Sequence, residues 1–134
     1  MGSRRRITVA LIGLVVLVVV GWFARDAVTT NAAELPGSQS GLPVRSLSVL
    51  PPETASTWRL VERGGPFSSN RDGVVFENRE KRLPAKPGSY YHEYTVPTPG
   101  SADRGARRLV VGQSRELYYT EDHYDSFVVV DPGK

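Results

Sequence analysis

Glu93 is the first residue whose type and setting indicate chemistry. It lies in the run YYHEYTV at residues 90–96, whose aromatic and β-branched side chains are typical of a β-strand. Strand alternation puts Glu93 on one face with Tyr91 and Thr95, and His92 on the opposite face. Charged side chains are rarely buried without a partner, so a carboxylate in so aromatic a strand predicts a nearby cation.

Three arginines could supply that cation. The prolines and glycine of residues 96–100 predict a loop, and Arg104, Arg107 and Arg108 then lead into the apolar run LVV, a second strand signal. If the two strands pair as a long-looped hairpin, Glu93 and at least one arginine meet across them. The pattern therefore predicts a base beside a cationic clamp. Arg107 alternates to the other face, so we expect it to have a structural role.

One helix and about five strands would position these groups. Prolines at residues 51–52 and glycines at residues 64–65 bracket a helical segment in which Ala55, Trp58 and Val61 are expected to face the core. Strands are predicted at residues 74–76, 90–96, 106–111, 117–120 and 126–130. This order predicts an α+β fold with one helix covering a face of an antiparallel β-sheet.

The composition narrows the classes of function. The chain has 134 residues and a net charge of +3, with no cysteine and two histidines. Residues 1–41 hold four arginines and two acidic residues, which leaves 13 basic against 12 acidic side chains in the remainder. Overall charge therefore does not indicate nucleic acid, and an electropositive site would have to be a local cluster such as the three arginines. The lack of thiols argues against a structural zinc site, and neither a metal nor a cofactor is predicted.

Residues 7–24, ITVALIGLVVLVVVGWFA, form the clearest apolar run. As a helix these uncharged residues would span about 27 Å, close to the ~30 Å hydrocarbon core of a bilayer. Arginines at residues 4–6 predict that the N-terminus stays inside. Two alternatives remain open: an uncleaved single-pass anchor, which we favour because Arg25 and Asp26 follow the run directly, or a signal peptide cleaved near residues 32–33. Either one predicts an extracytoplasmic domain, anchored in the membrane or secreted.

The remaining chain divides into a tether and one folded domain. Residues 25–42 continue with small and polar residues, glycine and proline, and are predicted to be a flexible linker after the hydrophobic helix of residues 1–24. The folded domain is then expected at residues 43–134, as a monomer.

Several blocks, taken together and in order, carry a resemblance. The segments PPE, GGPF, DGVVFENRE, LPAKPGSYYHEYTVPTPG, DRGARR and YYTEDHYDSF resemble the microbial guanyl-specific ribonucleases, above all the small exported bacterial enzymes related to barnase. The resemblance covers residues 47–130. It implies one N-terminal helix packed on a twisted antiparallel sheet, and a metal-independent endoribonuclease that forms a cyclic phosphate.

The resemblance also implies roles for individual residues. Glu93 corresponds to the general base, His123 to the general acid, and Arg104 and Arg108 to the arginines that bind phosphate. The guanine-binding set corresponds to Phe76, Glu77, Asn78, Arg79 and Glu80, with Tyr124 lining the active site.

Cleavage of this kind explains why such residue types are needed. A base removes the 2′-proton of ribose as the 2′-oxygen attacks phosphorus, and an acid protonates the departing 5′-oxygen; the two exchange roles when the 2′,3′-cyclic phosphate is hydrolysed. Guanidinium forks suit the phosphoryl oxygens, and a carboxylate such as that of Glu80 can accept both N1–H and N2–H of guanine. Because the nucleophile is a 2′-hydroxyl, DNA should bind without being cut.

An alternative function stays open: a non-catalytic exported RNA-binding or protein-interaction module with the same fold. It would require loss of the base or the acid, and Glu93 and His123 are both present. The resemblance further implies RNA as substrate and a barstar-like intracellular inhibitor as a partner to test for. The chain departs from those relatives in lacking the two cysteines that join the domain ends, near the positions of Ser46 and Lys134, so its stability should not depend on reductant.

Overall fold

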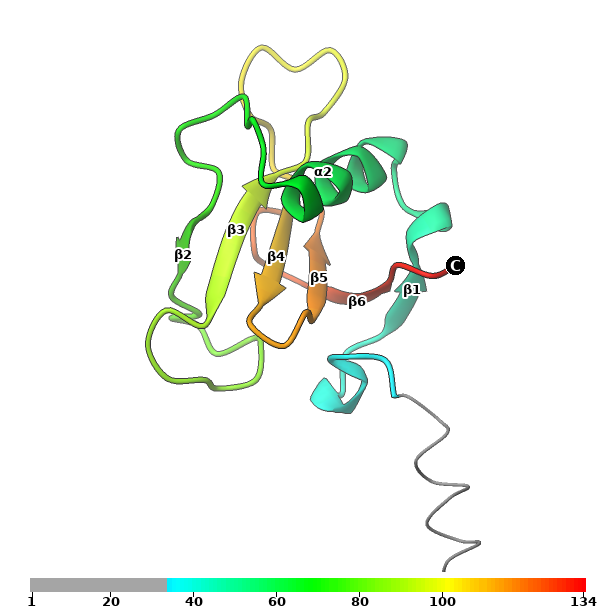
Figure 1. Ribbon diagram of the computed structural model, residues 1–134, viewed down its shortest axis with the longest axis vertical. Coiled ribbons are helices and arrows are strands. Elements are labelled where there is room, and N and C mark those ends of the chain that lie inside the picture. Colours follow the sequence, from blue (N-terminus) through cyan, green and yellow to red (C-terminus); the bar gives the residue numbers. More distant parts are fainter. Residues whose placement is uncertain (1–33) are drawn as a thin grey trace, which may run out of the picture. The chain divides into compact units, whose positions relative to one another are not determined.

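The computed structural model describes residues 34–134, so the hydrophobic helix predicted at residues 7–24 lies outside the described residues. The elements in chain order are η1 (Ser38–Ser40), β1 (Val44–Ser46), η2 (Leu47–Val49), α2 (Pro52–Arg63), β2 (Val74–Phe76), β3 (Tyr91–Thr95), β4 (Arg108–Gly112), β5 (Leu117–Thr120) and β6 (Val128–Asp131). Figure 1 shows α2 lying across one face of the sheet. Within residues 34–134, no helix combines the length and the apolarity needed to cross a membrane.

The predicted α+β class is confirmed, but the expectation of an antiparallel sheet of about five strands was wrong. The sheet has six strands in the order β1-β6-β5-β4-β3-β2, and β1 runs parallel to β6, which makes the sheet mixed. The remaining pairs are antiparallel. The β1 strand is three residues long, too short for an alternating pattern to reveal it in the sequence. Beside it, the backbone N–H of Ser48 donates to the carbonyl of Lys134 at 3.0 Å, so the two ends of the domain are joined by backbone hydrogen bonds.

The helix has the predicted bounds and is anchored through threonines. It ends at Gly64, which adopts a left-handed conformation (φ 80°) that favours glycine. Thr54 and Thr57 are its buried residues, at positions that the sequence analysis did not assign to the core. The Thr57 hydroxyl donates to the carbonyl of Thr95 at 3.0 Å, which ties α2 to the end of β3. Trp58 packs, partly buried, on the sheet beneath it, as predicted.

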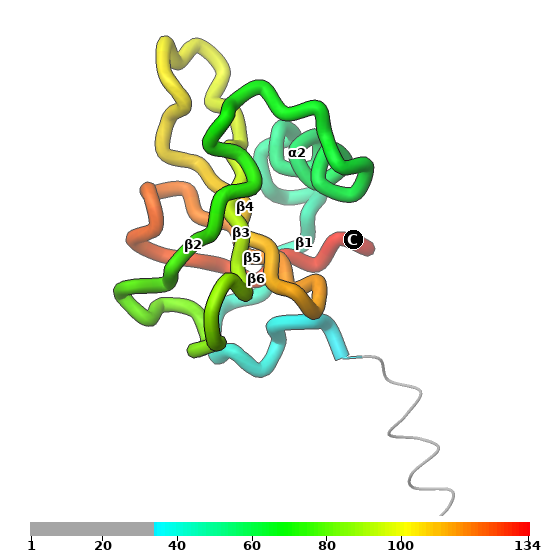
Figure 2. Tube along the Cα trace, turned by 60° about the vertical axis from the view of Figure 1, so that its left-hand side comes forward, coloured from blue at the N-terminus to red at the C-terminus, as the bar shows by residue number. Residues whose placement is uncertain are grey.

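The two faces of the sheet carry different clusters of side chains. On the helix side the buried members are Val96, Leu109, Leu117, Tyr119 and Val130. On the other side they are Leu83, Tyr91, Val110, Tyr118, Phe127 and Val129. Glu93 pairs with Val110 in the sheet and therefore lies on the face opposite α2. Figure 2 shows this division, with α2 on one side of the sheet and the chain between β5 and β6, drawn in orange-red, on the other.

Residues 35–42, which the sequence analysis assigned to the linker, lie against the second cluster. Leu35 and Leu42 pack on it as partly buried side chains. A Cβ at Gly37 would lie 3.1 Å from the phenol oxygen of Tyr118, so the backbone approaches the sheet closely there. These residues extend the packed unit toward the N-terminus and help to cover the face that carries Glu93.

Candidate active site

The hairpin of β3 and β4 brings the carboxylate and one arginine to the same face of the sheet. The predicted pairing is confirmed: Glu93 lies opposite Val110, and Thr95 lies opposite Arg108. Arg108 in turn lies opposite Thr120 of β5. Glu93 and Arg108 therefore occupy neighbouring cross-strand rows on the face opposite α2.

Tyr124 connects these two charged groups. Its phenol interacts with the side chains of both Glu93 and Arg108, whose charges act on it in opposite directions. Burial raises the pKa of the Tyr124 phenol above its ordinary value of 10.0, the Glu93 carboxylate raises it further, and the Arg108 guanidinium lowers it. The phenol therefore remains a neutral O–H group next to a carboxylate and a guanidinium. Its ring stacks on Phe76 with a centroid distance of 5.2 Å.

Two arginine side chains present unpaired donors. Arg108 is only 3% exposed, and its Nη1 donates to the carbonyls of Arg107 at 2.7 Å and Gly105 at 2.9 Å. Arg104 donates through Nε to the Thr95 hydroxyl at 3.0 Å. The remaining buried donors Arg104 Nη2 and Arg108 Nε have no hydrogen-bond partner among the described residues. Buried donors without partners are costly, so a phosphate-like anion that accepts from both would be bound favourably.

The loop of residues 97–107 is shaped to hold these arginines. Asp103 Oδ1 accepts from the Ser101 hydroxyl and from the backbone N–H of Gly105, both at 2.8 Å. These hydrogen bonds, the one from Gly105 foremost, hold the pKa of Asp103 below its ordinary value. Gly105 has a φ of +66°, and a Cβ there would lie 2.6 Å from the Thr98 hydroxyl oxygen, so only glycine fits.

His123 lies in the loop of residues 121–126, which joins β5 to β6. Its backbone N–H donates to the carbonyl of Ala106 at 3.0 Å, so this loop touches the 97–107 loop. The imidazole is exposed and lies next to Tyr124, with ring centroids 4.9 Å apart. Both residues have positive φ, 54° for His123 and 71° for Tyr124, in the left-handed region that side chains other than glycine rarely adopt.

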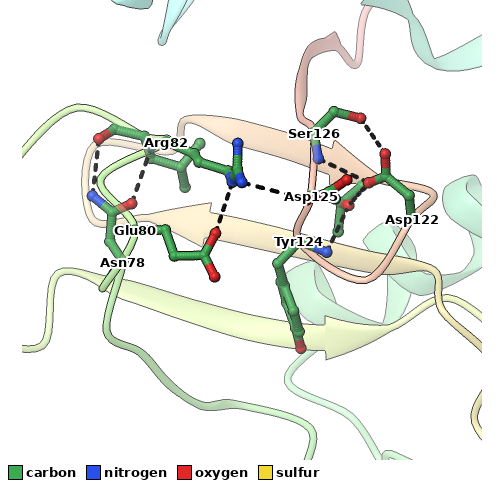
Figure 3. Close-up of polar contacts among 9 residues, drawn as sticks. Asn78, Glu80, Arg82, Asp122, Tyr124, Asp125 and Ser126 are labelled. Carbon is green, nitrogen blue, oxygen red and sulfur yellow. Dashed lines mark hydrogen bonds and ion pairs between the residues drawn. The ribbon is translucent and has the colours of Figure 1, made fainter.

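Asp122 holds the 121–126 loop in this strained conformation (Figure 3). Its Oδ1 accepts from the backbone N–H of Ser126 at 2.8 Å, and its Oδ2 accepts from the Ser126 hydroxyl at 2.6 Å. The Thr120 hydroxyl donates to Asp122 at 3.0 Å and accepts from the backbone N–H of Tyr124 at 3.0 Å. The hydrogen bonds from Ser126 lower the pKa of Asp122 below its ordinary value of 3.8.

The loop of residues 77–83 is held by one neutral side chain. Asn78 has a φ of 55°, and its amide donates to the carbonyl of Leu83 at 2.9 Å while accepting from the Leu83 N–H at 3.1 Å. Its side chain is therefore engaged within the loop, as Figure 3 shows. The carboxylate of Glu80, by contrast, belongs to a largely exposed side chain that lines the pocket, and its Oε2 accepts a hydrogen bond from Arg82 Nε at 3.0 Å.

A pocket of about 380 Å³ opens beside these groups. The pocket brings together the predicted guanine-binding residues and the predicted base. Its lining includes Phe76, Glu77, Asn78, Arg79, Glu80, Glu93 and Tyr124. Five further residues that the sequence analysis did not single out also line it: Arg71, Val74, Val75, Arg82 and Phe127. His123, Arg104 and Arg108 are not part of this lining, although Tyr124 connects the pocket to His123 and Arg108.

The residues that sequence reasoning missed are mostly those that hold others in place. Thr95 lies two positions after Glu93, so alternation alone placed it on the same face, but nothing indicated that it would anchor Arg104. Asp122 precedes Ser126 by four residues, a spacing that a side-chain-held turn could use. Among residues 34–134 no three or more His, Cys, Asp or Glu side chains are grouped to hold a metal ion.

Comparisons with known proteins agree with this geometry. A family model described as ribonuclease matches residues 33–131. The chain is 56% identical over 91 residues to guanyl-specific ribonuclease St of Saccharopolyspora erythraea, covering 68% of this chain and 90% of that protein. It is 52% identical over 86 residues to guanyl-specific ribonuclease Sa of Kitasatospora aureofaciens, covering 63% of this chain and 90% of that protein. A crystal structure of ribonuclease Sa2 with guanosine-2′-cyclophosphate is similar at a TM-score of 0.66 and 50% identity, covering 69% of this chain and 98% of that one.

Proposed function

Because this chain belongs to the guanyl-specific ribonuclease family, we propose that it is an endoribonuclease that cuts single-stranded RNA on the 3′ side of guanosine. Cleavage proceeds by transesterification to a 2′,3′-cyclic phosphate, which is then hydrolysed. The observation that carries this proposal is that Glu93 and Arg108 lie in neighbouring rows on one face of the sheet, and that Glu93 and Tyr124 line a pocket of about 380 Å³ there. A carboxylate, a guanidinium and an aromatic-lined pocket are what a base, a phosphate and a nucleobase require.

In the first step Glu93 accepts the proton of the 2′-hydroxyl, and the 2′-oxygen forms a bond to phosphorus. The bond between phosphorus and the 5′-oxygen breaks, and His123 donates the proton that this oxygen takes up. Hydrolysis reverses the two roles, since His123 then removes a proton from water and Glu93 returns one to the 2′-oxygen. The exposure of His123 and its place beside Tyr124 support this role.

Arg104 and Arg108 stabilise the charge that accumulates on the phosphoryl oxygens. Their buried unpaired donors, Arg104 Nη2 and Arg108 Nε, support this assignment. Both guanidinium groups are fixed in advance by Thr95 and by the carbonyls of the 97–107 loop, so little reorganisation accompanies the reaction.

Guanine is selected in the pocket formed by β2 and the 77–83 loop. The carboxylate of Glu80 accepts N1–H and N2–H, and backbone N–H groups near Asn78 and Arg79 donate to O6. The ring of Phe76, stacked on Tyr124, offers an apolar face to the base. A base without the paired donors of guanine would leave these groups unsatisfied, which is a strong basis for discrimination.

The experiment that tests this function offers GpC and ApC dinucleoside phosphates to the purified protein. Guanosine 2′,3′-cyclic phosphate should form with the wild type, while Glu93→Gln and His123→Ala should each slow its formation by about 10²–10⁴-fold. Equal turnover of ApC would remove the guanine assignment of Glu80 but leave a ribonuclease. Binding of RNA without any turnover would instead favour the non-catalytic module.

The location and the partners of the enzyme complete the proposal. Residues 7–24 export the domain, either as an anchor or as a cleaved signal peptide. Protein recovered from the medium without residues 1–24 would decide for secretion. An intracellular inhibitor would protect the producing cell from the enzyme before export, and pull-down from the cytosol with the inactive Glu93→Gln variant would reveal it.

A further inference from the structure

Arg82 joins the two loops that border the pocket. Its Nε donates to Glu80 Oε2 at 3.0 Å, and its Nη2 lies 3.4 Å from Asp125 Oδ1. Glu80 belongs to the 77–83 loop and Asp125 to the 121–126 loop, and Figure 3 shows Arg82 between them. One guanidinium thus contacts the carboxylate proposed to read guanine and a carboxylate two residues beyond His123.

Two other ion pairs at exposed arginines lack this arrangement. Arg79 pairs with Glu77 inside its own loop, and Arg115 pairs with Glu62 of α2, at a site that does not line the pocket. Arg82 itself lines the pocket, and 41% of its side chain is exposed. Its position is therefore at the mouth of the site rather than in the core.

We propose that Arg82 is a specificity-determining residue that positions Glu80 for guanine and keeps the 77–83 and 121–126 loops aligned. The inference rests on the proposed function and names a residue that neither the sequence analysis nor the proposed mechanism uses. Arg82 acts through Glu80 and is therefore a positioning residue rather than a catalytic one.

The chemistry of a carboxylate allows this role. An ionised carboxylate has two oxygens and about four lone-pair sites, so Glu80 can accept from Arg82 and still accept two hydrogen bonds from guanine. The terminal torsion of a glutamate is broad, and the Glu80 side chain is 71% exposed, so without a partner its carboxylate plane would be free to rotate. Fixing one oxygen before the base arrives lowers the entropy lost on binding.

The second contact of Arg82 explains why an arginine suits this position. A guanidinium presents donors in a planar fork and can serve two carboxylates at once, whereas the compact ammonium of lysine cannot hold the same geometry. Asp125 thereby fixes the orientation of the Arg82 fork. Its removal should weaken the effect of Arg82 but not abolish it, because the Nε contact to Glu80 remains.

The test compares Arg82→Gln, Arg82→Lys and Asp125→Asn in the full chain, with Arg115→Gln as a control that removes an exposed, ion-paired arginine elsewhere. Exposed ion pairs contribute modestly, so Arg82→Gln should raise KM for GpC about threefold to fivefold and leave kcat within twofold. The ratio of kcat/KM for GpC over ApC should fall by the same factor, and the affinity for guanosine 3′-monophosphate should fall with it. Arg82→Lys should lie in between.

The pair of substitutions tests the bridge itself. Asp125→Asn should show a smaller shift in the same direction, and Arg82→Gln/Asp125→Asn should be no worse than Arg82→Gln alone, because both changes remove one connected unit. Arg115→Gln should leave the GpC/ApC ratio unchanged.

Three outcomes would overturn the inference. An unchanged GpC/ApC ratio in Arg82→Gln would remove the specificity role. Tighter binding of guanosine 3′-monophosphate would mean that Arg82 competes with the base for Glu80. Equal losses for GpC and ApC together with a lower Tm would reduce Arg82 to a structural residue. Failure of the wild type to cut GpC would count against the proposed function, and the binding measurements would then still decide on Arg82.

Discussion

The 77–83 loop and the 121–126 loop both contain residues with positive φ, but different kinds of side chain stabilise them. Each holds two residues other than glycine at positive φ: Asn78 and Lys81 in the first, His123 and Tyr124 in the second. Such residues cost of order 1 kcal/mol or more each and persist only where their surroundings fix them. In the first loop the fixing side chain is the neutral amide of Asn78, and in the second it is the carboxylate of Asp122.

The two loops also differ in what they are attached to. Asn78 is hydrogen-bonded to the backbone of Leu83, a core residue that is 2% exposed. Asp122 is hydrogen-bonded to Ser126, which is exposed. The first loop is therefore anchored to the core through Leu83. The second loop has one buried contact, the Thr120 hydroxyl, which is hydrogen-bonded to Asp122 and to the backbone N–H of Tyr124, and it is otherwise held at the surface through Ser126. Damage to the first should appear mainly in stability and binding, and damage to the second mainly in rate.

The largest effect is expected from Asp122→Ala. Without the carboxylate the Ser126 N–H and hydroxyl lose their acceptor, and the left-handed residues next to His123 are no longer fixed. Misplacement of a catalytic group by about 1 Å can cost about 10²-fold, so kcat for GpC should fall by about that factor. Asp122→Asn keeps one acceptor oxygen for Ser126 and should recover most of the rate. A kcat within threefold of wild type in the alanine variant would show that the loop holds its shape unaided.

In the 77–83 loop, Asn78→Ala should lower stability and substrate binding more than it lowers kcat. It leaves the N–H and carbonyl of buried Leu83 without partners, which typically costs about 1–3 kcal/mol. A domain of this size should then lose several degrees of Tm, and KM for GpC should rise more than kcat falls. Asn78→Asp keeps the acceptor for the Leu83 N–H and should lie between the two. A large fall in kcat with an unchanged Tm would contradict the contrast drawn between the loops.

Local signals in the sequence were sufficient for most of the fold. The β2 and β5 strands and α2 have the predicted bounds, because short apolar runs between turn residues, and a helix between prolines and glycines, are specified by neighbours in the chain. The β1 strand was missed because its partner, β6, lies far along the chain and forms a parallel pair. Three residues carry no period from which such a pairing could be inferred.

The residues of the site also fall into those that the sequence predicts and those that it does not. Alternation placed Glu93 and Thr95 on one face, and the resemblance to a family supplied the roles proposed for the other residues. Asp122 and Arg82 fix the position of site residues, and they lie in loops that contain residues with left-handed backbone conformations. No propensity predicts that His123 and Tyr124 would adopt such conformations, so the bonds that depend on them could not be inferred from the sequence.

The pH dependence of stability should sharpen the comparison. Hydrogen bonds from Ser126 hold the pKa of Asp122 below its ordinary value of 3.8, so the carboxylate stabilises the folded state above that value. This contribution is lost as the pH falls through the lower, folded-state pKa. The Tm difference between wild type and Asp122→Asn should therefore be largest above pH 4 and shrink toward pH 2. The difference between wild type and Asn78→Ala should stay constant over this range, since an amide does not titrate. A constant difference for Asp122→Asn would mean that its hydrogen bonds do not favour the ionised form.

The smallest effect on activity is expected from Tyr124→Phe. This variant tests whether a residue of the 121–126 loop also titrates at alkaline pH, in addition to Asp122 at acid pH. The phenol interacts with Glu93 and Arg108, and loss of one such polar interaction typically costs about twofold to tenfold in kcat/KM. Burial, with the Glu93 carboxylate nearby, raises the pKa of the phenol above 10.0, so the hydroxyl stays protonated throughout the range in which the enzyme would be assayed. The alkaline limb of the pH–rate profile must then come from another group, and it should have the same midpoint in wild type and in Tyr124→Phe between pH 5 and 9.5. If the limb moved or vanished in the variant, the phenol would be titrating below its ordinary pKa. The guanidinium of Arg108 would then outweigh both burial and the Glu93 carboxylate at this position.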